Sequence, residues 1–219
     1  MNKINLKAKR KQTINSMMKE HILETAVEFL KQTKNINNFT MDNIAKFADI
    51  AKGTLYIYFK NKDDLLKELI QKLKKQSIQQ FQKIKNENIT VSDKFKKIFQ
   101  YMLEDIEKNI NFIRLLLQSI DCNENLKRDL HKDDELIINI FSDILKQALK
   151  NKEIKIENPD YAAKMIFACL VYLVRERGEG LREYMSITNE VKSFIKLFNF
   201  IAIKSTKNKN SNIKKERSK

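Results

Sequence analysis

Two short helical patterns with a three-residue break between them lie within residues 39–66, which read FTMDNIAKFADIAKGTLYIYFKNKDDLL. Their apolar or small positions recur as on one face of a helix: Ile44, Ala45 and Ala48 in the first pattern, and Leu55, Tyr58 and Phe59 in the second. The break consists of Asp49, Ile50 and Ala51, and we expect Ile50 to be buried inside the turn. Two short helices around a tight turn form a helix-turn-helix, and we expect that motif here.

Capping residues mark the ends of these helices. Thr40 is a favourable N-cap for the first helix, and Asp42 places negative charge in its first turn. Asn61 can cap the next helix, which carries Asp63 and Asp64 just inside its start. A longer helix is therefore predicted directly after the motif.

The exposed face of the second short helix has side chains suited to DNA. Thr54 can hydrogen-bond a base edge or touch a thymine methyl group. Gly53 lets one backbone approach another closely. The residues that can reach phosphate oxygens are Lys52, Tyr56, Tyr58 and Lys62, and Thr40 completes the set of candidate DNA contacts. The alternative is that the three helices are ordinary amphipathic helices of a core.

The segment GTLYIYFKNKDDLL resembles the signature of the TetR/AcrR family of bacterial transcriptional regulators. In that family an Ile-Ala pair and Ala-Gly-Val-Ser precede Gly-Thr-Leu-Tyr-x-Tyr-Phe, and a Lys and a Leu-rich helix follow. The resemblance covers only the N-terminal part of this chain. It implies an all-α fold with an N-terminal three-helix helix-turn-helix domain and a C-terminal helical bundle that binds a ligand and dimerises.

Two residues depart from the family pattern. Asp49 stands where the family usually has glycine, at a turn position that needs a left-handed backbone, which Asp tolerates better than most residues. Ala51 replaces the serine that usually caps the recognition helix, and loss of a cap costs about 0.5–2 kcal/mol. Both departures concern local stability and leave the proposed DNA contacts in place.

Composition agrees with a helical DNA-binding protein. Three glycines and one proline in 219 residues argue against a turn-rich β fold and leave almost nothing for a glycine-rich phosphate loop. The formal net charge of +15 suits a polyanion partner. The charge alone also fits a membrane surface or simple solubility, so the motif is the stronger indication.

Cysteines and hydropathy indicate a reduced, cytoplasmic protein with no membrane partner. Cys122 and Cys169 do not form a disulfide framework. We expect Cys169 to be a small core residue and Cys122 to be exposed, where thiol sensing is one alternative. The basic, polar N-terminus shows no signal peptide, and the apolar run 165–174 is too short to span a bilayer.

Patterning divides the chain into four parts. Residues 1–16 form a basic arm, 17–62 the helix-turn-helix domain, 63–204 a helical domain for which the resemblance implies ligand binding and dimerisation, and 205–219 a basic tail. The first clear helix runs over 17–33, and the helix from Asn61 to about Ile84 joins the two domains. One long helix is predicted for 126–150. Pro159 begins a helix capped by Asn158 that ends at one of two glycines, Gly178 or Gly180.

No pattern for metal binding or catalysis is visible. His21 and His131 stand at no ligand spacing from each other or from a cysteine, and His131 beside acidic residues is more simply a solvated helix start. No grouping of serine, histidine and carboxylate announces nucleophilic catalysis. We therefore predict no metal, no cofactor and no enzyme activity, with a helical-bundle enzyme as the less favoured alternative.

The C-terminal half supplies candidates for a dimer interface and a ligand pocket. The helix from Pro159 is apolar on more than one side. We therefore expect one side to be buried against the core and another against a second subunit. The interface candidates are Phe167, Leu170, Val171, Val174, Phe194, Phe198 and Ile201. Pockets between bundle helices are common ligand sites, and the pocket candidates are Phe81, Phe95, Phe99, Met102 and Phe112.

The sequence thus favours a ligand-responsive transcriptional regulator. We expect a homodimeric repressor that a small-molecule effector releases from a palindromic double-stranded DNA operator. The alternative is a helix-turn-helix protein that binds DNA constitutively or architecturally, without a ligand.

Overall fold

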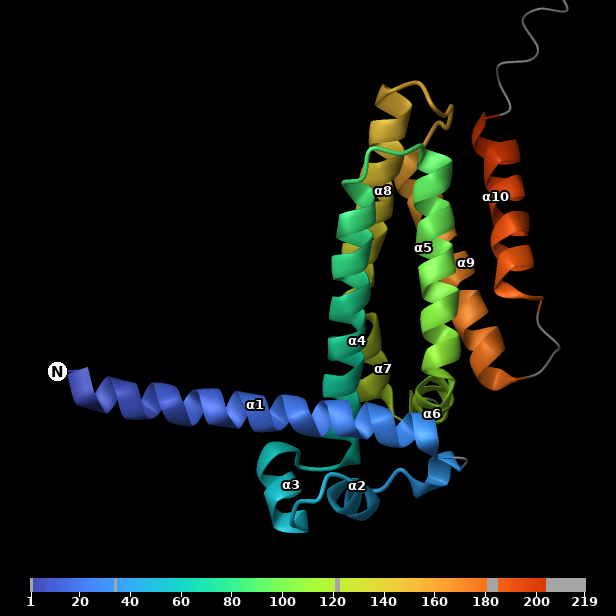
Figure 1. Ribbon diagram of the computed structural model, residues 1–219. Helices are drawn as coiled ribbons and strands as arrows, with labels where there is room; N and C mark the ends of the chain where they lie inside the picture. The colour runs from blue at the N-terminus through green and yellow to red at the C-terminus, as the bar shows by residue number, and fades with distance from the viewer. Residues whose placement is uncertain (1, 34, 121–122, 181–184, 204–219) are drawn as a thin grey trace, which may run out of the picture. The chain divides into compact units, whose positions relative to one another are not determined.

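The computed structural model describes residues 2–33, 35–120, 123–180 and 185–203, and this part of the chain contains helices and no strand (Figure 1). The helices are α1 Asn2–Gln32, η1 Ile36–Asn38, α2 Met41–Phe47, α3 Lys52–Tyr58, α4 Lys62–Lys85, α5 Val91–Lys108, α6 Ile110–Ile120, α7 Glu124–His131, α8 Asp134–Lys150, α9 Pro159–Glu179 and α10 Ile187–Ile203. The fold is all-α, with an N-terminal helix-turn-helix followed by a C-terminal helical bundle.

The contacts divide the chain into two compact units. Unit 1 comprises Met1–Lys75 and Glu107–Lys132, and unit 2 comprises Gln76–Ile106 and Asp133–Lys219. The chain therefore passes between the units three times, and both α4 and α5 contribute to each. The domain limits expected from the sequence stay a prediction.

Unit 1 holds the helix-turn-helix on a core to which α6 and α7 contribute. Phe112, Leu115 and Leu116 of α6 and Leu126 of α7 are buried among apolar side chains of α1 to α4. The amide of Asn111 at the start of α6 donates to the carbonyl oxygens of Leu30 and Thr33 at 2.9 and 3.0 Å. These bonds satisfy carbonyls at the end of α1, which a helix leaves without internal partners.

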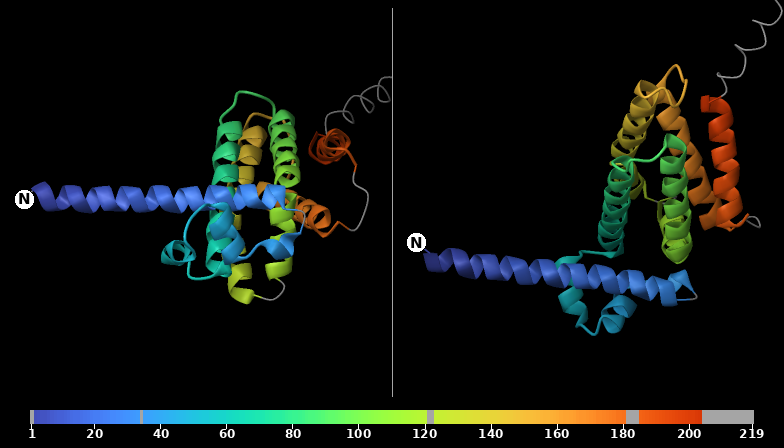
Figure 2. Two further views of the ribbon diagram at one scale, coloured as in Figure 1. Left: turned by 60° about the horizontal axis from the view of Figure 1, so that its bottom comes forward. Right: turned by 45° about the horizontal axis from the view of Figure 1, so that its top comes forward.

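Helix α1 begins at Asn2 and not near Met17, so the expectation that the first helix starts there was wrong (Figures 1 and 2). Residues 2–16 contain neither glycine nor proline, and nothing in them breaks a helix. The described side chains of residues 8–17 are all exposed, and burial on α1 begins at Ile22. The outer half of α1 therefore extends past the core it belongs to.

Unit 2 is organised around α8 and α9 and a cluster of aromatic rings. Phe141 of α8 lies 5.7 Å between ring centroids from both Phe81 and Phe95, and Phe95 lies 5.1 Å from Phe198 of α10. Helix α9 starts at the N-cap Asn158 with Pro159 in its first turn and ends at the left-handed Gly180, as predicted. These caps fix both ends of α9.

The single helix predicted for 126–150 is two helices in the structure. Helix α7 ends at His131, and α8 starts at Asp134 with Asp134 and Glu135 in its first turn. Carboxylates are favourable at a helix N-terminus and unfavourable near a C-terminus, so this acidic run starts a new helix more readily than it continues an old one. The two helices also belong to different units.

None of the helices in the described residues is both long enough and apolar enough to cross a bilayer.

Candidate nucleic-acid interface

The turn between α2 and α3 has the geometry expected from its sequence. Asp49 adopts a left-handed backbone with φ 52°, as predicted for a position usually taken by glycine. The N–H of Ile50 donates to the carbonyl oxygen of Ala45 at 3.0 Å, and the N–H of Ala48 donates to that of Ile44 at 2.9 Å. Ile50 is half-buried against the core of unit 1. These contacts hold α3 at a fixed angle to α2.

Ala51 occupies the N-cap of α3 in the extended conformation that a cap requires, with φ −63° and ψ 142°. Its side chain makes no capping hydrogen bond, as predicted for alanine. Thr40, in contrast, caps α2 through its Oγ1, which accepts from the N–H of Asn43 at 3.2 Å. The predicted cap Asn61 likewise accepts from the N–H of Asp64 at 2.9 Å.

The outward face of α3 is defined by the one buried residue of this helix. Leu55 is fully buried, so the residues about 200° from it around the helix, Gly53 and Ile57, point away from the core. The Ile57 side chain is 79% exposed. A Cβ added to Gly53 would meet nothing within 4 Å. The outward face of α3 is therefore an open strip that unit 1 itself leaves uncovered.

Charged and aromatic side chains flank this strip. Lys52 Nζ pairs with Asp42 Oδ1 of α2 at 2.6 Å and lies 6.0 Å from the ring centroid of Tyr56, which is 43% exposed. The hydrogen bond to Asp42, reinforced by its negative charge, raises the pKa of Lys52. The ammonium group beside the strip therefore stays charged at every physiological pH.

The predicted DNA contacts do not all lie on this face. Thr54 and Tyr58 are half-buried, and Tyr58 packs against the core. Lys62 is half-buried too, with Nζ 5.9 Å from the ring centroid of Phe39. Sequence reasoning missed Ile57, although its position two residues beyond Leu55 could have placed it on the outward face. It also missed Asp42 as the partner of Lys52.

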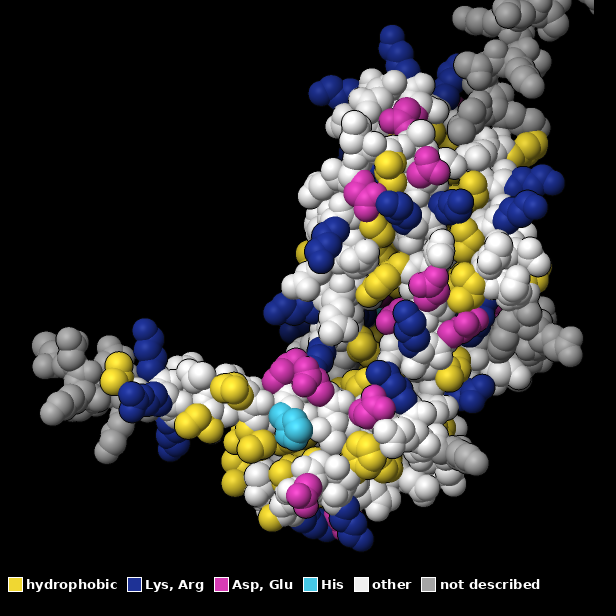
Figure 3. All heavy atoms as spheres, viewed as in Figure 1, with side chains coloured by type: hydrophobic (Ala, Val, Ile, Leu, Met, Phe, Trp, Pro, Cys, Tyr) yellow, Lys and Arg dark blue, Asp and Glu magenta, His cyan; other side chains and the backbone are white. Residues whose placement is uncertain are grey.

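The outer half of α1 adds positive charge to unit 1. Lys9, Arg10 and Lys11 are exposed there, and Figure 3 shows Lys and Arg side chains (dark blue) along this part of the helix. Exposed apolar side chains accompany them, among them Leu6 at 56% and Ile14 at 63%. The basic arm predicted for residues 1–16 is thus helical over its described part.

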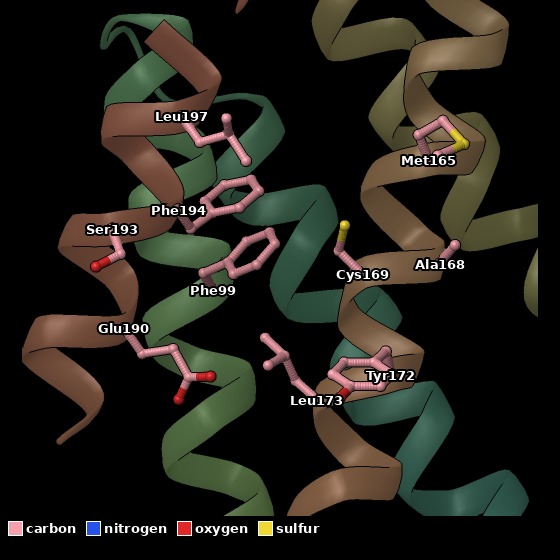
Figure 4. Close-up of a pocket in the computed structure, with 10 residues that line it drawn as sticks. All are labelled: Phe99, Met165, Ala168, Cys169, Tyr172, Leu173, Glu190, Ser193, Phe194 and Leu197. Carbon is pink, nitrogen blue, oxygen red and sulfur yellow. The ribbon is translucent and has the colours of Figure 1, made fainter. Parts of the chain in front are cut away.

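Unit 2 contains an open, mostly apolar groove of about 480 Å³ between α9 and α10 (Figure 4). Phe99 of α5 and Phe194 of α10 stack there with ring centroids 3.4 Å apart. Across from them lie Met165, Ala168, Cys169, Tyr172 and Leu173 of α9, and Glu190, Ser193 and Leu197 complete the α10 side. Cys169 is exposed in this groove, so its expected place in the core was wrong. Cys122 lies outside the described residues.

The pocket candidates are spread over both units. Phe81 and Phe95 are buried in the aromatic cluster of unit 2, and Met102 is half-buried. Phe112 lies in the core of unit 1. Phe99 is the one pocket candidate that lines the apolar groove, where the interface candidate Phe194 joins it.

The interface candidates on α9 and α10 also point in different directions. Leu170 and Phe198 are buried within the protomer, Phe167, Val174 and Phe194 are half-buried, and Val171 and Ile201 are exposed at 42% and 64%. A separate exposed stripe on α9, roughly opposite Leu170, consists of Tyr161, Met165 and Tyr172. Leu197 and Phe200 are exposed beside Ile201 on α10. One face of α9 is therefore buried within the protomer, and the opposite, apolar face is exposed in the described residues.

The helix-turn-helix, with its open strip on α3 and the lysine beside it, defines a DNA-binding protein of the helix-turn-helix class. Residues 22–69 match the model of the family described as bacterial regulatory proteins, tetR family. Residues 22–69 therefore form a DNA-binding domain of the TetR family, and the chain is a DNA-binding transcriptional regulator.

Similar proteins include regulators of fatty acid metabolism and degradation. The chain is 28% identical over 152 residues to the fatty acid metabolism regulator protein of Bacillus subtilis (strain 168), covering 68% of this chain and 77% of that one. Its fold is similar to that of FadR from Bacillus subtilis in complex with stearoyl-CoA, with a TM-score of 0.67, 24% identity and coverage of 81% and 96%. The fatty acid degradation regulator FadR from Bacillus halodurans gives a TM-score of 0.65, 23% identity and the same coverage.

Proposed function

We propose that this protein is a homodimeric repressor that binds a palindromic operator through α3 and that a small-molecule effector releases it from DNA. The observation that carries the proposal is the uncovered strip on α3. Ile57 is 79% exposed and nothing of the protein lies near the Cβ position of Gly53, so this face is free to enter a major groove.

Each residue near the strip has a proposed role. Gly53 lets the backbone of α3 come close to the DNA, and Ile57 contacts thymine methyl groups. Thr54 hydrogen-bonds a base edge at the side of the strip. The phosphate contacts come from Lys52 and Tyr56 next to the strip, with Thr40, Tyr58 and Lys62 at its margins.

Dimerisation would join two such strips on one face of the duplex. The surface we assign to the partner subunit consists of the exposed apolar side chains of α9 and α10 that do not line the groove, Tyr161, Val171, Phe200 and Ile201. Two-fold dimers use the same patch on both subunits, and permanent interfaces are apolar. A two-fold dimer requires an inverted repeat with half-sites about 34–36 Å apart or a multiple of that distance.

We assign the effector to the apolar groove of unit 2. Its walls offer the stacked rings of Phe99 and Phe194 and the side chains of Met165 and Leu173, which suit an aliphatic chain. The name of the Bacillus subtilis relative, a fatty acid metabolism regulator, supports a fatty-acid-derived effector. The hydroxyl of Ser193 lies on the α10 side, where it can donate to a ligand's polar end, whereas the Glu190 carboxylate is paired with Arg177.

The Gly53→Ala variant tests the role of the strip. An operator is first obtained by selecting full-length protein against random duplex DNA, and we expect it to be an inverted repeat. Gly53 has an ordinary helical backbone and open space at Cβ, so alanine should not destabilise the fold, whereas the added methyl group obstructs the close approach of DNA. We expect unchanged or higher thermal stability together with weaker operator binding. Unchanged operator affinity would contradict the assignment of this face.

The effector site is tested through Cys169. In a Cys122→Ser background, the rate at which a maleimide labels Cys169 should fall when a saturating long-chain fatty acid or acyl thioester is present. The operator complex should dissociate over the same concentration range. Full protection without any change in operator affinity would favour the alternative of a constitutive DNA binder.

A further inference from the structure

A second hollow in unit 2 is lined by four lysines. It has a volume of about 460 Å³ and lies between the end of α4, the start of α5 and the second half of α8. Lys85, Lys94, Lys146 and Lys150 line it, against a single lining carboxylate, Asp143. None of its lining residues is shared with the apolar groove.

The fold orients three of these lysines. Lys85 Nζ pairs with Asp143 Oδ2 at 2.5 Å, and Lys146 Nζ pairs with Asp160 Oδ1 at 2.7 Å. Lys94 Nζ donates to the carbonyl oxygen of Lys85 at 2.6 Å, a neutral acceptor at the end of α4. Among the described residues, two of the four lysines are therefore paired with carboxylates and two are not, so the hollow keeps an excess of positive charge.

Such an arrangement favours an anion with several charges. Like charges gathered around one hollow repel each other, and a bound anion relieves that repulsion. The lysine ammonium is a strong phosphate ligand with three donors. A volume of this size is in the range of small-molecule sites, and the buried side chain of Ile144 gives the floor an apolar patch.

We propose that this lysine cleft binds an organic anion with two or more phosphate groups, of the nucleoside di- or triphosphate class. The phosphates would lie among the four ammonium groups and the organic part against Ile144. The site is independent of the apolar groove and of the proposed effector, so it would give the protein a second ligand-binding site.

Calorimetry on the full-length protein at fixed ionic strength tests the proposal, with ADP, ATP, pyrophosphate and inorganic phosphate as separate probes. We expect ADP and ATP to bind one site per chain and more tightly than inorganic phosphate. The double variant Lys146→Gln/Lys150→Gln should weaken ADP binding about tenfold or more, because it removes two charged hydrogen-bond donors. The control Lys96→Gln/Lys192→Gln carries the same net charge, alters exposed lysines outside the cleft, and should leave ADP binding within about twofold.

A second control separates the cleft from the DNA-binding surface. Lys52→Gln should leave ADP binding unchanged. Weaker ADP binding by this variant would show that the anion binds at α3, and it would overturn the proposal. Equal losses in the two double variants would also overturn it, since they would show only general charge attraction. So would phosphate binding as tight as that of ADP, or a short non-operator duplex DNA that displaces ADP in the Lys52→Gln variant.

Discussion

Ile57 is a large aliphatic side chain, 79% exposed, on the outward face of α3, the helix that we propose to face DNA. Contact with a thymine methyl group would remove its apolar surface from water, worth roughly 0.8 kcal/mol for each CH₂ group buried. Its exposure also means that truncation should not disturb the core.

Ile57→Ala should therefore weaken operator binding by about 1–2 kcal/mol per half-site at unchanged thermal stability. The measurement is a titration of operator DNA in which thymine is replaced by uracil at each position in turn. At the contacted position the wild type should lose affinity on replacement and the variant should not. Equal losses in both proteins at every position would show that Ile57 contacts no methyl group.

Asp42 is the second residue with a testable effect, because it holds Lys52 at 2.6 Å beside the strip. Asp42→Asn removes a negative charge near the phosphates and frees Lys52 to bind them. We expect tighter binding to any duplex and a slope of log affinity against log salt that is steeper by about 1. The matched variant Glu28→Gln, which removes an exposed carboxylate from α1, should change neither quantity appreciably. Weaker binding by Asp42→Asn would instead show that Asp42 positions Lys52 for its DNA contact.

At the scale of the element, α3 is a seven-residue helix whose N-cap makes no side-chain hydrogen bond. Ala51 already has the extended backbone of a cap, so a serine there can accept a hydrogen bond without rearrangement. Ala51→Ser should raise the free energy of unfolding by about 1 kcal/mol in urea titrations. Ala8→Ser, the same change at an exposed position within α1, should give no gain. An equal change in the free energy of unfolding in both variants would show that the missing capping hydrogen bond at Ala51 does not limit the stability of the protein.

Local sequence was sufficient for these element ends and insufficient for the faces of α9. The left-handed Asp49, the uncapped Ala51 and the caps Thr40 and Asn158 depend on a few neighbouring residues, and all four were predicted correctly. Helix α9 is apolar on more than one side between Met165 and Val174, so periodicity could not tell which side the core would take. Its buried face proved to contain Leu170, which had been assigned to the partner subunit.

For a related reason, the sequence could not predict which distant helices pack against each other. Phe112 is apolar and periodic with its neighbours, which predicts that one face of α6 is buried but not against what. It was assigned to the ligand half, yet it packs among side chains of the helix-turn-helix unit. In the same way, the outer half of α1 is helical because nothing in its sequence breaks a helix, although its described side chains find no core to pack against.

At the scale of the whole molecule, the first prediction concerns assembly. Val171→Glu/Ile201→Glu places two charges on exposed apolar positions of α9 and α10 outside the groove and should convert a dimer into a monomer in sedimentation velocity at micromolar concentration. The monomer should also lose most of its operator affinity. Leu136→Glu changes a comparably exposed side chain on α8 and should leave the dimer intact. A dimer that survives the double variant would exclude this surface as the interface.

The last prediction follows from how the chain connects its two units. It passes between them at residues 75–76, 106–107 and 132–133, and α4 runs through the first crossing without interruption. A ligand that changes unit 2 can therefore change unit 1 through continuous backbone. It shifts the protein toward a state that does not bind the operator only if it binds that state better, and a hundredfold preference corresponds to about 2.8 kcal/mol. By linkage, the operator must weaken ligand binding by the same factor.

Calorimetric titrations of the fatty acyl ligand, with and without saturating operator, should then differ by the factor by which the ligand weakens operator binding. Equal ligand affinities in the two titrations would rule out release by this ligand, and tighter ligand binding on the operator would identify it as a co-repressor.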